Sequence, residues 1–168
     1  LPTDDDTART AQKLAELCAL CEPYRVRPML EFMVYRKMRT VGDARRLIEL
    51  AGDPDAGICV DALHLDRSGG VPGDLRSMPP ALFDYVQLCD APATRPSDAD
   101  IPLEARSGRL YPGDGALPLR ELLAALPAGI PLSLEAPSQR HAVLSVTERA
   151  SLIAAKTRRL FDGGDAST

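Results

Sequence analysis

The chain has 168 residues, of which 45% are apolar and 26% are charged, and this composition is typical of one globular domain. Its 20 basic and 24 acidic residues give a net charge of −4, which argues against a nucleic-acid partner because phosphate backbones require clustered Lys and Arg. No apolar stretch approaches the roughly 20 residues that span a bilayer, and no signal-peptide pattern opens the chain. Four cysteines without zinc-knuckle spacing fit a reducing compartment. We therefore expect a cytoplasmic protein that binds neither nucleic acid nor membrane.

The first third of the chain predicts a helix, a strand and a second helix. Apolar residues from Leu14 to Cys21 recur on one helix face, and Pro23 ends the pattern. A strand at 27–33 follows. The run Thr40-Val41-Gly42-Asp43 then resembles a capping signal for a helix that ends at Gly52.

Three more strand–helix units are predicted after residue 52. The first has a strand at 58–61, a loop at 66–70 and a helical turn at 74–78. The second has a strand at 85–87, a long polar, Pro-rich loop at 91–115 and a helix at 119–126. The third has a strand at 130–135, a capping box at Ser145–Glu148 and a helix ending near Phe161, and a frayed tail at 163–168 follows it.

This order indicates an α/β fold. Strands that alternate with helices imply right-handed parallel crossovers, and strands that are apolar throughout are buried on both faces. Four such units make half of an eight-unit barrel, and a free four-stranded sheet would leave two parallel edges unpaired. We therefore predict that residues 1–168 form one domain, and that the other half of the barrel is missing from this chain or is supplied by a second chain.

Four of the apolar runs end on a side chain with an oxygen donor, namely Glu31, Asp61, Gln87 and Glu135. In a parallel sheet these ends meet at one rim, where such folds place their chemistry. A single acidic residue there is more often a solvated rim residue or a cap. Three carboxylates and an amide together favour a hard divalent cation, with the neutral amide of Gln87 as the weakest ligand.

The chain resembles the sugar phosphate isomerase/epimerase family, the xylose-isomerase-like TIM barrels, over nearly its whole length. The segments that carry the resemblance are Leu30-Glu31-Phe32, Val60-Asp61-Ala62-Leu63-His64 with Arg67-Ser68-Gly69-Gly70, Tyr85-Val86-Gln87-Leu88-Cys89-Asp90, Pro112-Gly113-Asp114-Gly115 and Leu134-Glu135. The resemblance implies that this chain is the C-terminal half of the barrel, its last four β/α units. It also implies that Glu31, Asp61, Gln87 and Glu135 bind the metal, which would be Mn, Mg, Co or Zn.

The resemblance also suggests catalytic and substrate-binding roles. It implies that Glu31 and Glu135 face opposite sides of the substrate carbon, so that one removes a proton and the other returns one. His64 would donate a hydrogen bond to a substrate oxygen or carry a proton, although a loop histidine satisfied by backbone is the plain alternative. Of the two arginines that flank Ser107-Gly108, Arg106 is favoured over Arg109 for substrate contact, and Arg67 is a weaker candidate.

The sequence predicts a divalent-metal enzyme that abstracts a proton next to the carbonyl of a small polyhydroxylated substrate and stabilises an enediolate. An isomerase or epimerase is favoured. Many relatives carry His where this chain has Gln87, and a Gln there is similar to bacterial 3-dehydroshikimate dehydratases, which makes a lyase the second candidate. A third is a non-catalytic half-barrel remnant or assembly partner, in which the chain pairs with itself or with the missing half.

Overall fold

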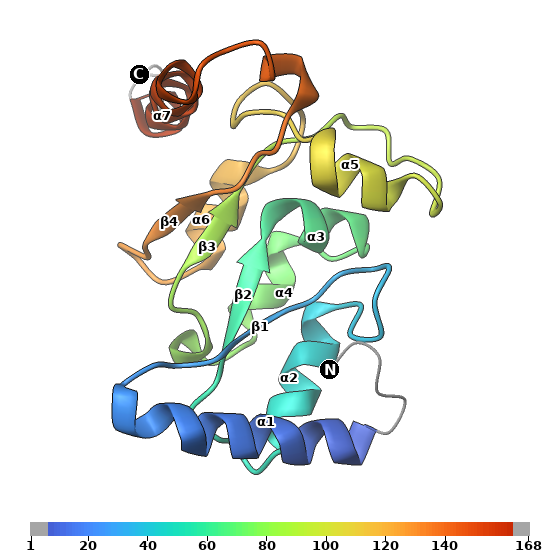
Figure 1. Ribbon diagram of the computed structural model, residues 1–168, viewed down its shortest axis with the longest axis vertical. Helices are drawn as coiled ribbons and strands as arrows, with labels where there is room; N and C mark the ends of the chain where they lie inside the picture. Colours follow the sequence, from blue (N-terminus) through green and yellow to red (C-terminus); the bar gives the residue numbers. More distant parts are fainter. Residues whose placement is uncertain (1–6, 163–168) are drawn as a thin grey trace.

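The computed structural model describes residues 7–162 and contains a four-stranded, all-parallel sheet in the order β1-β2-β3-β4 (Figure 1). The strands are β1 (Met29–Glu31), β2 (Gly57–Asp61), β3 (Val86–Leu88) and β4 (Leu132–Leu134). The predicted parallel α/β architecture is confirmed, with strands that are shorter than expected at β1 and β4. The tail predicted at 163–168 lies outside the described residues.

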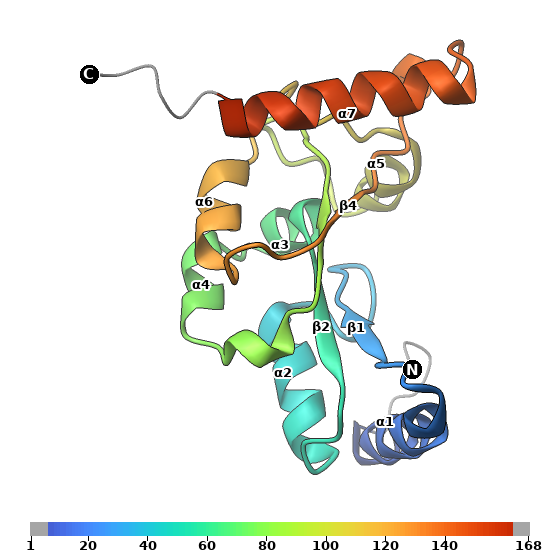
Figure 2. The ribbon, with the colours of Figure 1, turned by 90° about the vertical axis from the view of Figure 1, so that its left-hand side faces the viewer.

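The helices surround this sheet in layers. The α-helices α2 (Val41–Leu50), α4 (Pro72–Arg76) and α6 (Leu119–Ala125) lie together on one face (Figure 2). Helix α1 (Thr7–Cys21) packs against α2. Helices α3 (Ala62–Arg67) and α5 (Ile101–Ser107) follow β2 and β3 in the chain. Helix α7 (Val146–Asp162) runs across the end of the molecule toward which the strands point (Figure 2). Short 3-10 helices cover Glu22–Tyr24, Pro80–Leu82 and Gln139–His141.

Both predicted helix starts are confirmed. Thr40 Oγ1 accepts the backbone N–H of Asp43 at 3.1 Å, and Asp43 Oδ2 accepts the N–H of Thr40 at 2.9 Å, which is a complete capping box. Ser145 and Glu148 form the equivalent pair before α7. These local exchanges satisfy backbone donors that the first turn of a helix leaves free.

Two short helices were not predicted from the sequence. The chain from Asp61 to Arg67 turns at once into α3, because the side chain of Asp61 caps that helix. The loop predicted at 91–115 contains α5, whose Pro102 lies in the first turn, where proline is tolerated. Both helices have seven residues or fewer, so their apolar periodicity is too short to recognise in the sequence.

The sheet is buried in its middle and open at its sides. Every residue of β2 is buried, whereas Leu132 and Leu134 of β4 remain 37% and 36% exposed. Within residues 7–162, the outer edges of β1 and β4 pair with no further strand. The prediction that another half-barrel completes this sheet stays a prediction. No helix in the described part of the chain is long and apolar enough to cross a membrane.

Candidate metal centre

The register of the sheet places the predicted oxygen donors on one face. Glu31 pairs with Cys59, and Asp61 pairs with Gln87. Because side chains alternate along a strand, Cys59 and Asp61 point to the same face and carry Glu31 and Gln87 with them. The alternate residues of β2 and β3 point to the other face and belong to the apolar core. The backbone N–H of Glu135, the residue directly after β4, donates to the carbonyl of Leu88 at 3.1 Å, and this bond places Glu135 at the same rim.

Three side chains form a compact ligand cluster at this rim. One ligand atom each from Glu31, Asp61 and His64 lies within 4.8 Å of the others. Asp61 is fully buried, and its Oδ1 accepts the backbone N–H of His64 at 3.0 Å as the cap of α3. The same cap therefore fixes the carboxylate and turns the His64 ring toward Glu31, whose Oε1 lies 3.6 Å from His64 Nε2.

Arg109 is a buried cation, only 2% exposed, and its guanidinium contacts this cluster. Its Nη1 donates to Asp61 Oδ2 at 2.6 Å and to the carbonyl of Glu135 at 2.9 Å, and its Nη2 lies 3.5 Å from His64 Nε2. Nε donates to the carbonyl of Ala105 at 2.8 Å. Burial opposes the charge, but the carboxylate of Asp61 raises the pKa of Arg109, so the guanidinium stays a cation.

Glu31 is poised to exchange a proton near neutral pH. Burial, and then the charges of Asp61 and Glu135, raise the pKa of Glu31 from 4.5 to about 7, while Arg109 acts in the opposite direction. A carboxyl with such a pKa can act as a general base at physiological pH.

His64 is neutral at the same pH because burial lowers its pKa. The ring is 1% exposed, and the ring of Tyr35 meets it edge-on with centroids 5.8 Å apart. Its Nδ1 is buried with no hydrogen-bond partner among the described residues. A neutral, buried imidazole can bind a metal or hydrogen-bond a substrate oxygen.

The two remaining predicted ligands lie on the same face but have different surroundings. Glu135 Oε2 is buried and has no hydrogen-bond partner within the described residues, so this oxygen is free to bind a cation. Gln87 Oε1 accepts the Sγ–H of Cys59 at 3.0 Å. Burial raises the pKa of Cys59 to about 12, so this thiol keeps its proton and the bond. Metal binding by Glu135 and by Gln87 stays a prediction.

Within residues 7–162, neither arginine predicted to contact substrate hydrogen-bonds to Glu31, Asp61 or His64. Arg106 is exposed in the last turn of α5. Arg67 is 1% exposed, and its three guanidinium nitrogens bond to Glu104, Asp66 and the carbonyl of Pro92. These contacts join α3 to α5, so the geometry favours a structural role for Arg67, and substrate contact by either residue remains untested.

Arg109 is the functional candidate that sequence reasoning passed over. Arg106 and Arg109 flank the same Ser-Gly pair, and nothing in the residues themselves says which one turns inward. Since α5 ends at Ser107 and Gly108 caps it, Arg106 stays on the exposed side of the helix while Arg109 enters the core. The available signal in the sequence was the run Arg106-Ser107-Gly108-Arg109. Choosing between its two arginines required knowing that α5 ends at Ser107.

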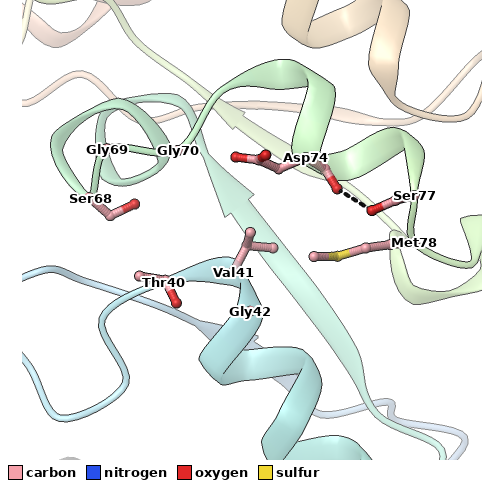
Figure 3. Close-up of a pocket in the computed structure, with 9 residues that line it drawn as sticks. All are labelled: Thr40, Val41, Gly42, Ser68, Gly69, Gly70, Asp74, Ser77 and Met78. Atoms are coloured by element: carbon pink, nitrogen blue, oxygen red, sulfur yellow. Dashed lines mark hydrogen bonds between the residues drawn. The ribbon is translucent and has the colours of Figure 1, made fainter.

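A cleft of about 320 Å³ lies outside this cluster (Figure 3). It is enclosed by the start of α2, the turn after α3, and α4, and none of the lining residues belongs to the candidate metal centre. Thr40 and Asp74 on its wall already bond to the backbone N–H groups of Asp43 and Val71. The cleft therefore offers a ligand few free polar groups.

Comparison with known proteins identifies the class to which this fold and site belong. The model of the xylose isomerase-like TIM barrel family matches residues 2–159. The chain belongs to this family, and the family resemblance predicted from the sequence is confirmed.

Individual proteins and solved structures are also similar to this chain. It is 26% identical over 115 residues to the inosose isomerase of Halalkalibacterium halodurans, an alignment that covers 67% of this chain and 39% of that protein. The crystal structure of the IolI protein with a bound zinc atom is similar with a TM-score of 0.80 and 20% identity, covering 94% of this chain and 59% of that one. A probable 3-DHS dehydratase, AsbF from Bacillus anthracis, matches with a TM-score of 0.68 and 14% identity, covering 91% and 56%. The chain thus spans less than two thirds of each.

Proposed function

We propose that this chain supplies the metal-binding part of a divalent-metal-dependent isomerase or epimerase that acts on a small polyhydroxylated carbonyl compound. The observation that carries the proposal is the convergence of Glu31, Asp61 and His64 beside Arg109 at the ends of parallel strands. The family membership and the similarity to an inosose isomerase support the same class of reaction.

The residues at the rim fit a divalent cation. Two carboxylates and an imidazole are suitable ligands for Mn, Mg, Co or Zn, and the unpartnered Oε2 of Glu135 would add a further oxygen, with Gln87 beside it. Three carboxylates and one guanidinium leave a charge of about −2, which one divalent ion balances. When bound, such an ion supplies Lewis-acid polarisation of the substrate carbonyl.

The side chains of this chain would perform the proton transfer. As an ionised carboxylate, Glu31 would take a proton from the carbon next to the carbonyl. Glu135 would return a proton on the opposite side. Neutral His64 would donate a hydrogen bond to a substrate oxygen, and Arg109 would stabilise the negative charge of the enediolate as a fixed cation.

Metal content per chain, measured by mass spectrometry after incubation with Mn, Co, Mg or Zn, tests this proposal. We expect about one ion per chain, and its loss in Asp61→Ala and Glu135→Ala variants that remain folded. Glu49→Gln is the matched control, since Glu49 is exposed on α2 and its side chain pairs with that of Arg45. No ion under any of these conditions would overturn the metal-enzyme proposal and favour a non-catalytic remnant.

A 3-dehydroshikimate dehydratase is the second candidate. It rests on Gln87, which stands on the metal-facing side of β3 and is paired with Asp61. Conversion of 3-dehydroshikimate to an aromatic catechol acid, followed by ultraviolet absorbance, separates this lyase from an isomerase.

In this proposal, the rest of the wall of the substrate pocket would come from further β/α units. This part of the proposal follows from the unpaired edges of β1 and β4 among the described residues, and from the share of each relative that the chain spans. The units belong either to the N-terminal half of a longer polypeptide or to a second copy of the chain. The cytoplasmic location predicted from the sequence is consistent with four free thiols.

A further inference from the structure

Asp90 is a buried carboxylate with no part in the proposed proton transfer. It lies two residues after β3 and is 2% exposed. Its Oδ2 accepts the backbone N–H groups of Gly113 at 3.0 Å and Gly115 at 2.9 Å, and its Oδ1 accepts those of Ala91 at 2.9 Å and Leu117 at 3.0 Å. Four neutral donors thus surround one buried charge. Such a charge is costly without them, so the loop is built around this carboxylate.

The shape of the loop fits that carboxylate closely. A Cβ on Gly115 would lie 2.4 Å from Asp90 Oδ1 and 2.3 Å from the carbonyl of Ala91, so no larger residue fits without moving one of them. Gly113 has φ +87°, a conformation that side chains disfavour. The Pro-Gly-Asp-Gly run therefore has its glycines where Asp90 and the turn require them.

The backbone of Asp90 also forms two hydrogen bonds with Leu110, the residue after Arg109. Asp90 N donates to the carbonyl of Leu110 at 2.9 Å, and Leu110 N donates to the carbonyl of Asp90 at 2.8 Å. On its other side, Arg109 N donates to the carbonyl of Pro137 at 3.3 Å. The main chain that carries Arg109 is thus clamped between the ends of β3 and β4.

This clamp leads directly to the candidate metal centre. From its fixed backbone, Arg109 places Nη1 2.6 Å from Asp61 Oδ2, while the cap of α3 occupies Asp61 Oδ1 at 3.0 Å. Each oxygen of Asp61 thus carries one hydrogen bond, which sets the direction of its remaining lone pairs. The bonds of the guanidinium hold the far end of the Arg109 side chain, and the fixed backbone holds its near end.

We propose that Asp90 is a positioning residue for the metal centre, which acts through Leu110 and Arg109 to orient the carboxylate of Asp61. This inference rests on the proposed function, because it concerns the metal-binding role of Asp61. Residues that orient a metal ligand typically change metal affinity by about 10-fold to 100-fold when they are replaced.

Cobalt(II) binding, measured by titration calorimetry and by the visible absorption of the bound ion, tests the inference. Asp90→Asn keeps the volume but turns one acceptor into a donor that faces backbone N–H groups. We expect it to weaken cobalt affinity about 10-fold and to alter the cobalt spectrum. In an Arg109→Met background, the same change should have less than about a 2-fold effect, because Asp90 acts through Arg109.

Controls separate positioning from general loss of structure. Asp114→Asn removes a carboxylate from the same loop and its ion pair with Lys156, but not a contact of Asp90, and should bind cobalt like the wild type. If Asp90→Asn does not fold, Gly115→Ala displaces the same carboxylate and carries the same expectation.

The outcomes distinguish the inference from the proposed function. Wild-type affinity in a folded Asp90→Asn or Gly115→Ala variant, or an equal loss with and without Arg109, would overturn the inference alone. A wild-type protein that binds no cobalt would overturn the metal centre and the inference together.

Discussion

At the scale of single residues, the candidate site depends on how buried charges are balanced. Glu31, Asp61 and Glu135 bring three acidic groups to one rim, and Arg109 is the cation placed among them. The balance is incomplete for Glu31, whose pKa is raised to about 7. Burial is the largest cause of this shift, and repulsion from Asp61 and Glu135 adds to it; a divalent ion bound at the rim would offset both effects by stabilising the carboxylate.

Metal affinity should therefore depend on pH through Glu31. Because its pKa is about 7, a proton competes with the ion below that pH, and we expect affinity to fall by up to about tenfold per pH unit there and to level off above it. Calorimetric titration with cobalt across this range measures the slope. Glu31→Gln should lose the slope and Glu49→Gln should retain it; a flat profile in the wild type would contradict the role given to Glu31.

The same shift has the opposite sign for the stability of the metal-free protein. The folded state holds the proton of Glu31 more tightly than the unfolded state does, so this contribution to stability is complete below pH 4.5 and is lost as the pH rises through about 7. Added metal should reverse the trend at the upper end, because it binds the deprotonated carboxylate.

At the scale of elements, a buried ion pair joins α3 to α5. Arg67 is 1% exposed, and Glu104 of α5 accepts two of its hydrogen bonds, at 2.8 and 2.9 Å. Because α5 leads directly into Arg109, the pair also steadies the approach to the candidate metal centre.

Replacing Glu104 by Gln should be strongly destabilising. The change removes the charge from the partner that accepts two hydrogen bonds of Arg67, while the ion pair of Arg67 with Asp66 remains, so we expect the free energy of unfolding to fall by about 2 kcal/mol, measured by urea denaturation. The exposed pair of Arg45 and Glu49 is the control, and Glu49→Gln should change stability by less than about 1 kcal/mol. Equal small effects of both variants would show that the buried pair is not structural.

The helices with long apolar periodic patterns could be predicted from the sequence, and the short ones could not. α2 and α7 were predictable because each is a long amphipathic run with a capping box. α3 and α5 were missed because six or seven residues make barely two turns. The ends of the strands were predictable as donor positions, whereas the choice of Arg109 over Arg106 needed α5 to be in place.

At the scale of the whole molecule, the described sheet is open. β1 and β4 have unpaired outer edges within residues 7–162, and Leu132 and Leu134 of β4 are exposed on the face that helices cover elsewhere. Open parallel edges with exposed leucines favour pairing with another chain or segment.

The chain should therefore associate in solution when it is purified alone. We expect sedimentation velocity to show species heavier than the 18.1 kDa monomer as concentration rises, and replacement of both Leu132 and Leu134 by Lys to shift them toward the monomer. Leu103→Lys is the control, since Leu103 is 63% exposed on α5 away from β4. A wild-type chain that stays monomeric at every concentration would contradict this expectation.

Local periodicity and the direction of the strands were enough to predict the alternation of strands and helices, the parallel sheet and the rim on which Glu31, Asp61, Gln87 and Glu135 stand. The family was predicted from the resemblance of particular segments. The three-dimensional packing was needed to see that His64 faces Glu31, that Arg109 bonds to Asp61 and that the backbones of Asp90 and Leu110 bond to each other. Those contacts join residues from different units, and their geometry depends on how each loop packs over the sheet, which no local pattern encodes.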